Sequence, residues 1–401
     1  MHISRIPDHD DKIICMISCC HSLLDDRIYK KEALTLARNG YRVVHIGYGE
    51  DFKDIYTDDA IRLVQIKKTK IEQCSFSALF QAAKSIAADV YHLHDVELCR
   101  IALKLQRLFW QPKVIYDAHE PYNVFLRDSW RARPKGRLFL RDIPAVIAEK
   151  RILSKVDYLI ATEENVAARF RKKNPHTAII YNYSYFHPNN SLLNADNKRF
   201  DLIYCGSLSE TKGIFLMLNA FAEARKRGYA YRMVIVGGFY NPTVRAEIEK
   251  MIQKEKLSNH LLFTGELPFE EVSRYYQQSK VAFCLLSSNR TNRLILPIKL
   301  FEYAAFGLPV IGSNFGHIAE IIQDNHIGVC VNPHDANEVA SALIDLLSGE
   351  KYKSYIHQCL HCVRMKYLWK NQEEKLLDIY EQLLGLQDED SFCLDRPLSN
   401  G

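Results

Sequence analysis

The chain has 401 residues, of which 47% are hydrophobic and 25% charged, the balance of a globular protein long enough for two domains. Its 53 lysines and arginines against 48 aspartates and glutamates leave a net charge of +5, too small an excess to indicate nucleic-acid binding. No apolar run has the length of a membrane-spanning helix, and the polar start MHISRIPDHDDK is not typical of a secretory signal, so we expect a cytoplasmic protein.

The first half of the chain alternates short apolar runs with segments of helical spacing. The expected strands are 13–18, 42–47, 61–66, 89–94, 113–116, 158–162 and 178–181. The expected helices are 26–40, 76–88, 97–109 and a long basic segment after residue 116. This alternation predicts a parallel sheet covered by helices on both faces.

The polar, Asn-rich segment 183–198 predicts a linker, after which the same pattern restarts. The expected strands are 201–205, 232–236, 261–264, 281–285 and 310–312. The expected helices are 213–226, 242–255, 336–347, 352–367 and 369–384, followed by a disordered tail at 387–401. Two successive doubly wound α/β units would bind ligands in a cleft at the carboxyl ends of their strands.

The cysteines indicate a reducing compartment rather than a disulfide framework. Several of the 11 lie in apolar strand-like runs, where cysteine serves as a small buried hydrophobe: Cys15, Cys205, Cys284 and Cys330. Cys359 and Cys362 form a CxxC pair beside His357 and His361, but no second ligand pair follows at zinc spacing. We interpret this pair as helix packing.

The stretch LPIKLFEYAAFGLPVIGSN, residues 296–314, has the features of a helix that binds an anion at its start. Pro297 stands where a helix would begin, a position for which proline is pre-organised. The amides of Ile298 and Lys299 would point out of the helix N-terminus toward a phosphate, and the Lys299 side chain adds a positive charge. Glu302 follows about one turn later, where a carboxylate can accept hydrogen bonds from both ribose hydroxyls.

A second stretch, GSLSETKG at 206–213, follows an expected strand and opens a helix. Its first glycine lets a ligand approach the backbone, and Lys212 can meet a diphosphate from the opposite side. Taken singly, each stretch also fits an ordinary strand-to-helix turn or a helix-surface carboxylate. Together in one domain, they favour a nucleoside diphosphate site.

The order of these motifs resembles the retaining GT-B glycosyltransferases of family 4. GSLSETKG, VIVGG, FTGELPFEEV and LPIKLFEYAAFGLPVI resemble the family's donor domain, while HSLLDDRIYKKEALTLARNGYRVVHIG, DVYHLHDVEL and VIYDAHE resemble its N-terminal domain. The resemblance implies an acceptor domain at 1–190, a donor domain at 191–365 and a crossover helix at 366–386 that packs on the first domain. It also implies transfer of a hexose from UDP- or GDP-sugar to a glycan or lipid-linked acceptor in bacterial cell-surface polysaccharide or lipopolysaccharide assembly.

The resemblance also implies residue roles. Glu302 would hold the donor ribose, Lys212 and Lys299 the diphosphate, and His119 would lie beside the donor sugar, so that His119, Lys212 and Glu302 are the catalytic candidates. The full donor-binding set is Gly206, Ser207, Lys212, Gly237, Gly265, Leu267, Arg293, Ile298, Lys299 and Glu302. The acceptor-side candidates at the strand ends are Asp25, Arg27 and Asp95.

The sequence departs from the family pattern at two positions. Leu294 stands where the family often has the first glutamate of Glu-x7-Glu, and Ser207 where it often has an arginine. Arg290 and Arg293 either supply the missing charge or are solvated loop arginines.

The cationic groups and the helix-end amides would stabilise the charge that builds on the leaving diphosphate, so we expect no metal or other cofactor. No Asp-x-Asp occurs in the C-terminal half to bind a divalent ion. With no carboxylate placed as a nucleophile, the family analogy implies retention through same-face attack on an oxocarbenium-like state.

The segment 127–155 carries nine basic and three acidic residues with interleaved aromatic and apolar side chains. It indicates either peripheral binding to an anionic membrane or an ordinary solvated helix face.

Three alternative hypotheses assume the same fold but a different function: a nucleotide-sugar epimerase, a phosphorylase or a non-catalytic partner subunit. A nicotinamide-dependent enzyme is disfavoured, because neither half has GxGxxG after its first strand.

Overall fold

The structure is a computed structural model that describes residues 12–67, 75–119, 139–188 and 198–386. The described residues divide into two compact units, the first formed by those up to 181 and those of 372–386, the second by those of 182–371. Among the described residues, no helix combines the length and apolarity that crossing a membrane requires. The expected domain boundary at 190–191 and the expected tail at 387–401 lie outside the described residues.

The first unit is an eight-stranded sheet in the order β3-β4-β2-β1-β5-β6-β7-β8, in which only β3 runs antiparallel to its neighbour. Its strands are β1 (Ile13–Ile17), β2 (Arg42–Gly49), β3 (Lys53–Tyr56), β4 (Arg62–Lys67), β5 (Val90–Leu93), β6 (Lys113–Ala118), β7 (Tyr158–Ala161) and β8 (Thr177–Ile179). The parallel order reverses between β1 and β5, which is the switch point where such sheets bind ligands.

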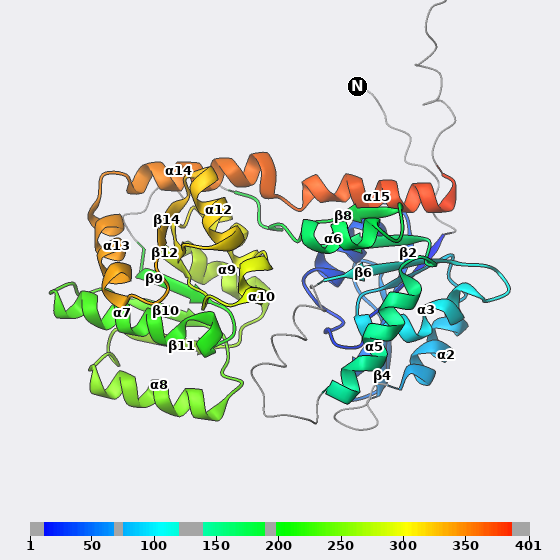
Figure 1. The fold of residues 1–401 in the computed structure, drawn as a ribbon, viewed down its shortest axis with the longest axis horizontal. Coiled ribbons are helices and arrows are strands. Elements are labelled where there is room, and N and C mark those ends of the chain that lie inside the picture. The colour runs from blue at the N-terminus through cyan, green and yellow to red at the C-terminus, as the bar shows by residue number, and fades with distance from the viewer. Residues whose placement is uncertain (1–11, 68–74, 120–138, 189–197, 387–401) are drawn as a thin grey trace, which may run out of the picture. The chain divides into compact units, whose positions relative to one another are not determined.

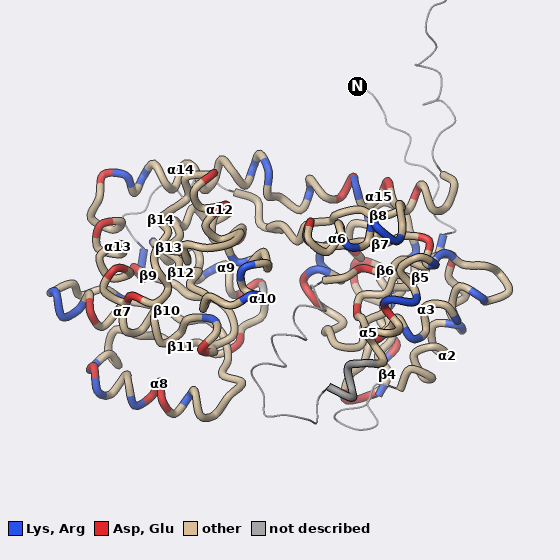
Figure 2. The backbone as a smooth tube through the Cα atoms, viewed as in Figure 1, with Lys and Arg blue, Asp and Glu red and all other residues tan. Residues whose placement is uncertain are grey.

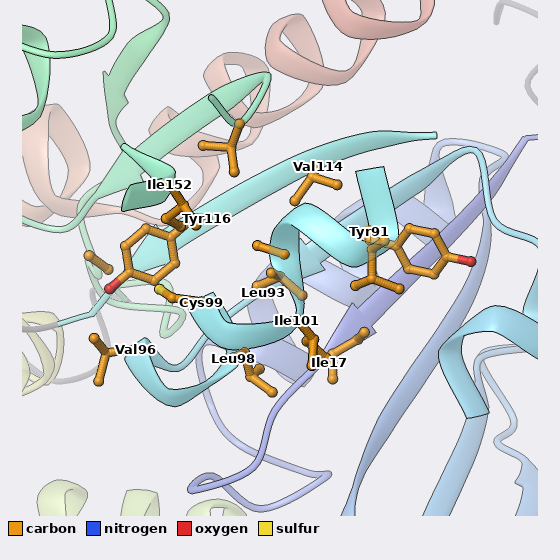
Figure 3. Close-up of a cluster of buried hydrophobic side chains, with 14 of the residues drawn as sticks. Ile17, Tyr91, Leu93, Val96, Leu98, Cys99, Ile101, Val114, Tyr116 and Ile152 are labelled. Carbon is orange, nitrogen blue, oxygen red and sulfur yellow. The ribbon is translucent and has the colours of Figure 1, made fainter. Parts of the chain in front are cut away.

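Helices cover both faces of this sheet (Figure 1). They are a π-helix (Ile28–Ala33), α1 (Leu34–Arg38), α2 (Phe76–Ile86), a 3-10 turn (Val96–Leu98), α3 (Cys99–Gln106), α5 (Phe139–Ile152), α6 (Glu164–Arg171) and α15 (Lys370–Leu384). The core beneath α3 and α5 joins fully buried side chains of β1, β5 and β6, among them Ile17, Leu93 and Tyr116 (Figure 3). Burial on both faces explains why these strands read as continuous apolar runs.

The second unit has six parallel strands in the order β11-β10-β9-β12-β13-β14. The strands are β9 (Phe200–Cys205), β10 (Met233–Val236), β11 (Leu261–Gly265), β12 (Ser279–Cys284), β13 (Val310–Ser313) and β14 (Gly328–Val331). The order reverses between β9 and β12, so these two strands flank the switch point. Both units are therefore doubly wound, which confirms the expected fold class.

The helices of the second unit follow the expected pattern with additional short elements. They are a 3-10 turn (Glu210–Lys212), α7 (Ile214–Lys226), α8 (Pro242–Lys254), α9 (Phe269–Gln277), α10 (Arg290–Leu294), α11 (Ile298–Ala305), α12 (Gly316–Asn325), α13 (Ala336–Ser348), α14 (Tyr352–Cys362) and a π-helix (Val363–Tyr367). Basic and acidic residues are interspersed along α8 and α15, so neither helix carries charge of one sign (Figure 2). Cys359 and Cys362 are buried in α14, in agreement with the packing interpretation.

The described part of the expected linker is packed rather than free. Ser184 is fully buried, and its backbone bonds to Tyr367 and Trp369, while the Tyr183 ring contacts the rings of Phe301 and Tyr367. The linker was predicted from its polar composition, which does not indicate these aromatic contacts. From Gln372 onward α15 belongs to the first unit, where the Tyr181 amide donates to the Gln372 side chain over 3.0 Å.

Candidate functional site

Two glycines bring separate backbone turns into contact at the carboxyl ends of β9 and β10. Gly206 and Gly237 have φ angles of +138° and +140°, and a Cβ on Gly237 would overlap the carbonyl oxygen of Gly206. The Gly237 amide donates to the Gly265 carbonyl over 2.8 Å, which ties in the end of β11. Only glycine accommodates both the dihedral angles and the close approach. Three of the expected donor-site glycines therefore form one surface.

The Lys299 ammonium lies directly over this glycine surface. Its Nζ would be 2.6 Å from a Cβ on Gly206, and it lies 4.3 Å from the ring centroid of Tyr204. Burial would lower the pKa of Lys299, but its neighbours Tyr204 and Cys284 outweigh burial and raise it, so the side chain stays cationic. The Lys299 cation thus lies against the backbone of Gly206 and beside the Tyr204 ring.

Lys299 is the second residue of α11, so the same place receives a helix N-terminus. Pro297 is the N-cap, one position earlier than expected, and no side chain caps the helix. The first-turn amides, including that of Ile298, add their partial positive charge to the ammonium. This combination is suited to an anion.

Lys212 approaches the switch point from the second predicted stretch, residues 206–213. It ends a 3-10 turn, and Gly213 follows with φ +76°, where a Cβ would overlap the Leu285 carbonyl oxygen. Burial raises the pKa of the Cys284 thiol to about 11, against the charges of Lys299 and Lys212. The positive charges of both lysines are therefore close enough to the carboxyl end of β12 to oppose the rise in the Cys284 pKa.

The Glu302 carboxylate is oriented by a tyrosine that the sequence did not single out. The Tyr276 hydroxyl of α9 donates to Glu302 Oε2 over 2.8 Å. Burial, and then the charge of Glu302, hold the pKa of Tyr276 well above its ordinary value, so the phenol remains a donor. A tyrosine within FEEVSRYYQ reads as ordinary core, and nothing in that pattern marks this contact.

The other expected donor-side residues, Ser207, Leu267 and Arg293, each make separate contacts. The Ser207 carbonyl accepts from Tyr204 over 2.9 Å, and Leu267 packs against the core. Arg293 is exposed on α10; its guanidinium donates to Ser288 over 2.6 Å and lies 5.0 Å from the Phe315 ring centroid. The described side-chain contacts of Arg293 are thus with Ser288, just before α10, and with Phe315, just before α12, and not with the glycine surface.

In the first unit, β5 and β6 present a polar row on one face of the sheet. His92 and His94 alternate along the HLHD run, and Asp117 and His119 alternate along YDAHE on the neighbouring strand. Residues two apart on a strand share a face, which brings these side chains together. The sequence singled out only His119, although the matching spacing in both motifs was the available signal.

Arg27 is the centre of this buried row. Its guanidinium donates to Asp117 Oδ2 over 3.1 and 2.8 Å and to the Ile180 carbonyl over 2.9 Å, and it lies 2.9 Å from Glu32 Oε1. Burial would raise the pKa of Asp117, but Arg27 and then His119 hold it well below its ordinary value. Burial raises the pKa of Glu32 well above its own, so Asp117 is the charged partner of Arg27.

The four groups Glu32, His92, His94 and Asp117 lie within 4.8 Å of one another and are fully buried. Such a set resembles a metal centre, but the Arg27 guanidinium already places a cation against both carboxylates. We therefore assign this cluster to Arg27 and not to a metal.

His119 lies at the exposed end of the row. Its Nε2 is 3.5 Å from Asp117 Oδ2 and 3.3 Å from His94 Nδ1, and its carbonyl accepts from Thr162 over 2.8 Å. Its ring centroid lies 4.9 Å from that of His21. These neighbours fix the orientation of the His119 ring.

The three acceptor-side candidates all make hydrogen bonds or ion pairs within the protein. Arg27 is 2% exposed and bonded within the protein, so the geometry does not support its direct contact with an acceptor. Asp25 Oδ1 accepts from the amides of Arg27 and Ile28. Asp95, 5% exposed, accepts from the Cys20 amide over 3.1 Å and lies 2.8 Å from His21 Nδ1. His21 was missed at the sequence level, and its side chain is 32% exposed, more than Arg27 or Asp95.

Residues 190–358 match the family described as glycosyl transferases group 1. The chain is also similar to the amylovoran biosynthesis glycosyltransferase AmsK of Erwinia amylovora, with 27% identity over 164 residues, 40% of this chain and 39% of AmsK. The match thus spans about two fifths of that relative.

Solved structures match nearly the whole chain. Sucrose-phosphate synthase from Thermosynechococcus elongatus superposes with a TM-score of 0.72 at 19% identity, covering 94% of this chain and all of the other. HepE of Anabaena in complex with UDP-glucose gives a TM-score of 0.67 at 12% identity, covering 92% and 99%. These similarities show that the fold is GT-B.

Proposed function

We propose that this chain, which carries a glycosyl transferases group 1 domain within a GT-B fold, is a glycosyltransferase that takes a hexose from a UDP- or GDP-sugar. The observation that carries the proposal is the Lys299 ammonium, held over the bare backbone of Gly206 at the start of α11. A diphosphate placed there meets a full charge and helix-end amides together.

Glu302 and Tyr276 complete the donor site in this proposal. The carboxylate accepts from the two ribose hydroxyls while Tyr276 holds its orientation. The amide contact between Gly237 and Gly265 borders the nucleobase side, toward Leu267. HepE, which has the same fold, was solved with UDP-glucose, in support of a nucleotide-sugar ligand.

Transfer breaks the bond between the sugar and the β-phosphate, and negative charge builds on the leaving diphosphate. Lys299, Lys212 and the α11 amides stabilise that charge, so the proposed reaction needs no divalent ion at this site. His119, oriented by Asp117, polarises or positions the sugar. Attack occurs on the face the diphosphate leaves, with retention of configuration.

For the acceptor we propose a glycan or a lipid-linked sugar at a membrane surface; the similar protein AmsK is an amylovoran biosynthesis glycosyltransferase. Much of the basic segment 127–155 lies outside the described residues. Its described end borders a cavity of about 470 Å³ between α3 and α5, where Arg100 and Arg151 flank Leu103, Ile147 and Ile152. Cationic and apolar groups together suit an anionic lipid.

Membrane binding is tested by co-sedimentation with vesicles of phosphatidylglycerol and phosphatidylcholine at low salt. The expected result is binding that falls with salt and with the paired change Arg100→Glu and Arg151→Glu. Failure of the unaltered chain to sediment contradicts the membrane proposal and leaves the donor proposal intact.

The donor proposal is tested by a thermal-shift screen against UDP, GDP, ADP and CMP, followed by turnover of the matching nucleotide sugar. Ligand at a hundred times its Kd stabilises the folded chain by about 2.7 kcal/mol. Glu302→Ala is expected to abolish turnover. Nucleotide binding without any hydrolysis or transfer would instead favour a non-catalytic partner subunit, which the departures at Ser207 and Leu294 already suggest as the alternative.

A further inference from the structure

The loops after β1 and β5 bring two thiols and two carboxylates together at the switch point of the first unit. Ile17 pairs with Leu93 in the parallel register of these strands, so Cys19 and Asp95, each two residues further on, come to the same place. The four groups that converge are Cys19, Cys20, Asp95 and Glu97, whose ligand atoms all lie within 4.8 Å of one another.

The spacing of the sulfurs fits a tetrahedral metal. Cys19 Sγ and Cys20 Sγ are 3.8 Å apart. Two thiolates, each about 2.3 Å from a tetrahedral zinc ion, also lie about 3.8 Å apart. Both residues are reduced thiols and not a disulfide. The present arrangement therefore needs little adjustment of the sulfurs to receive an ion.

The carboxylates complete a four-ligand set. Asp95 is 5% exposed and fixed by the Cys20 amide, so it is held in place before any ion arrives. The contact of 2.8 Å between Asp95 and His21 Nδ1 is an outer interaction of the kind that orients a ligating carboxylate. Glu97 follows on the adjoining 3-10 turn and is half-buried.

We propose that these four side chains bind one thiolate-preferring divalent cation of the Zn²⁺ class. Sulfur ligands select against Mg²⁺ and Ca²⁺, whereas a mixed sulfur and oxygen set suits zinc. Cys20 is exposed, so an ion can enter from solvent. The ion crosslinks the two loops and steadies His21 beside His119; it has no part in breaking the sugar–phosphate bond and does not depend on the proposed function.

Two other clusters of candidate metal ligands in the described residues differ from this site. In the cluster around Asp117, the Arg27 guanidinium supplies the cation. In α14, the thiols of Cys359 and Cys362 donate to backbone carbonyl oxygens within the core. Neither combines thiols with a solvent-exposed ligand.

The test uses the full chain, stripped with chelator under reducing conditions and dialysed against Zn²⁺ or Co²⁺ alone. The expected result is one ion retained per chain, with Co²⁺ giving tetrahedral visible bands and thiolate charge-transfer absorption. Cys20→Ser is expected to weaken retention more than about tenfold and to diminish the charge-transfer band. Glu97→Gln is expected to weaken retention while leaving that band in place.

Cys330→Ser is the matched control, because it removes one partly buried thiol from the second unit. It should retain the ion as the unaltered chain does. Since Cys20 is exposed, the metal-free Cys20→Ser chain should melt at the same temperature as the metal-free parent, and only the parent should be stabilised by Zn²⁺. No retained ion, equal retention by Cys20→Ser, or Co²⁺ bound without thiolate absorption each overturns the proposal.

Discussion

Arg27 and Asp117 form a buried pair, although 90 positions separate them in the chain. Two guanidinium nitrogens of Arg27 donate to the same oxygen of Asp117, and the two side chains are 2% and 0% exposed. The same Asp117 oxygen lies 3.5 Å from His119 Nε2. The pair thus links the loop after β1 to the one histidine that the sequence motifs pointed to.

Replacing Arg27 with alanine is expected to lower the free energy of unfolding by about 3–5 kcal/mol, because it leaves the charge of Asp117 buried and unpaired. Urea denaturation followed by circular dichroism measures the loss. The matched control is Arg62→Ala, which breaks a partly exposed pair with Asp54 and should cost less than about 1 kcal/mol. Equal losses in the two variants would show that Arg27 is not holding a buried charge.

The buried histidine His45 is expected to make stability fall with acid. Burial lowers its pKa to about 4 from 6.5, so the folded chain binds fewer protons there than the unfolded chain. The contribution is fully present above pH 6.5 and is lost as pH falls toward 4, by at most about 1.4 kcal/mol per pH unit. His45→Gln should reduce this slope in denaturation series between pH 7 and 4.5; an unchanged slope contradicts the assignment.

Gly206→Ala is expected to weaken nucleoside diphosphate binding at least tenfold, because the added methyl group takes the space beside the Lys299 ammonium. Binding is measured by calorimetry with the nucleotide that the screen identifies. Gly228→Ala is the matched control: its φ of +95° imposes a similar backbone strain, but no atom lies within 4 Å of the new Cβ. If both variants bind the nucleotide equally weakly, backbone strain and not the blocked space beside Lys299 explains the loss, which contradicts the prediction.

Tyr276→Phe is expected to weaken nucleoside diphosphate binding by about five- to tenfold, the worth of one hydrogen bond of about 1–1.5 kcal/mol. The loss follows because Glu302 is no longer oriented toward the ribose. Inorganic pyrophosphate, which has no ribose, should bind the variant and the parent equally. A matching loss for pyrophosphate would place Tyr276 at the phosphates and contradict the ribose assignment.

The sequence predicted both sheets well, because their buried strands are continuous apolar runs between helices. It missed β3, an exposed edge strand with the mixed sequence KDIY, and β14, whose four residues begin with a glycine. It also missed α6, which is short and begins with acidic residues. Short or edge elements owe their conformation to neighbouring strands, which local patterning does not reveal.

The residues of the proposed donor site carry more local sequence signal than the residues of the buried row. Glycine turns, Pro297 and Lys299 carry local signals, and the structure brings Gly206, Gly237 and Lys299 together. The pairings of Arg27 with Asp117 and of His92 with Tyr380 span 90 and 288 positions, so no window of sequence contains both partners. The contact between Tyr276 and Glu302 was missed for the same reason, over 26 positions.

The most direct test of the central claim is calorimetric titration of UDP and GDP into the unaltered chain, Lys299→Ala and Lys226→Ala. Lys226 is an exposed lysine of α7 paired with Glu255, and its loss should leave affinity unchanged. The account predicts that one nucleotide binds the unaltered chain and binds Lys299→Ala at least about tenfold more weakly, since a charge-assisted hydrogen bond contributes about 1.5–3 kcal/mol. Equal affinity of all three chains for that nucleotide, or no binding of either nucleotide, would contradict it.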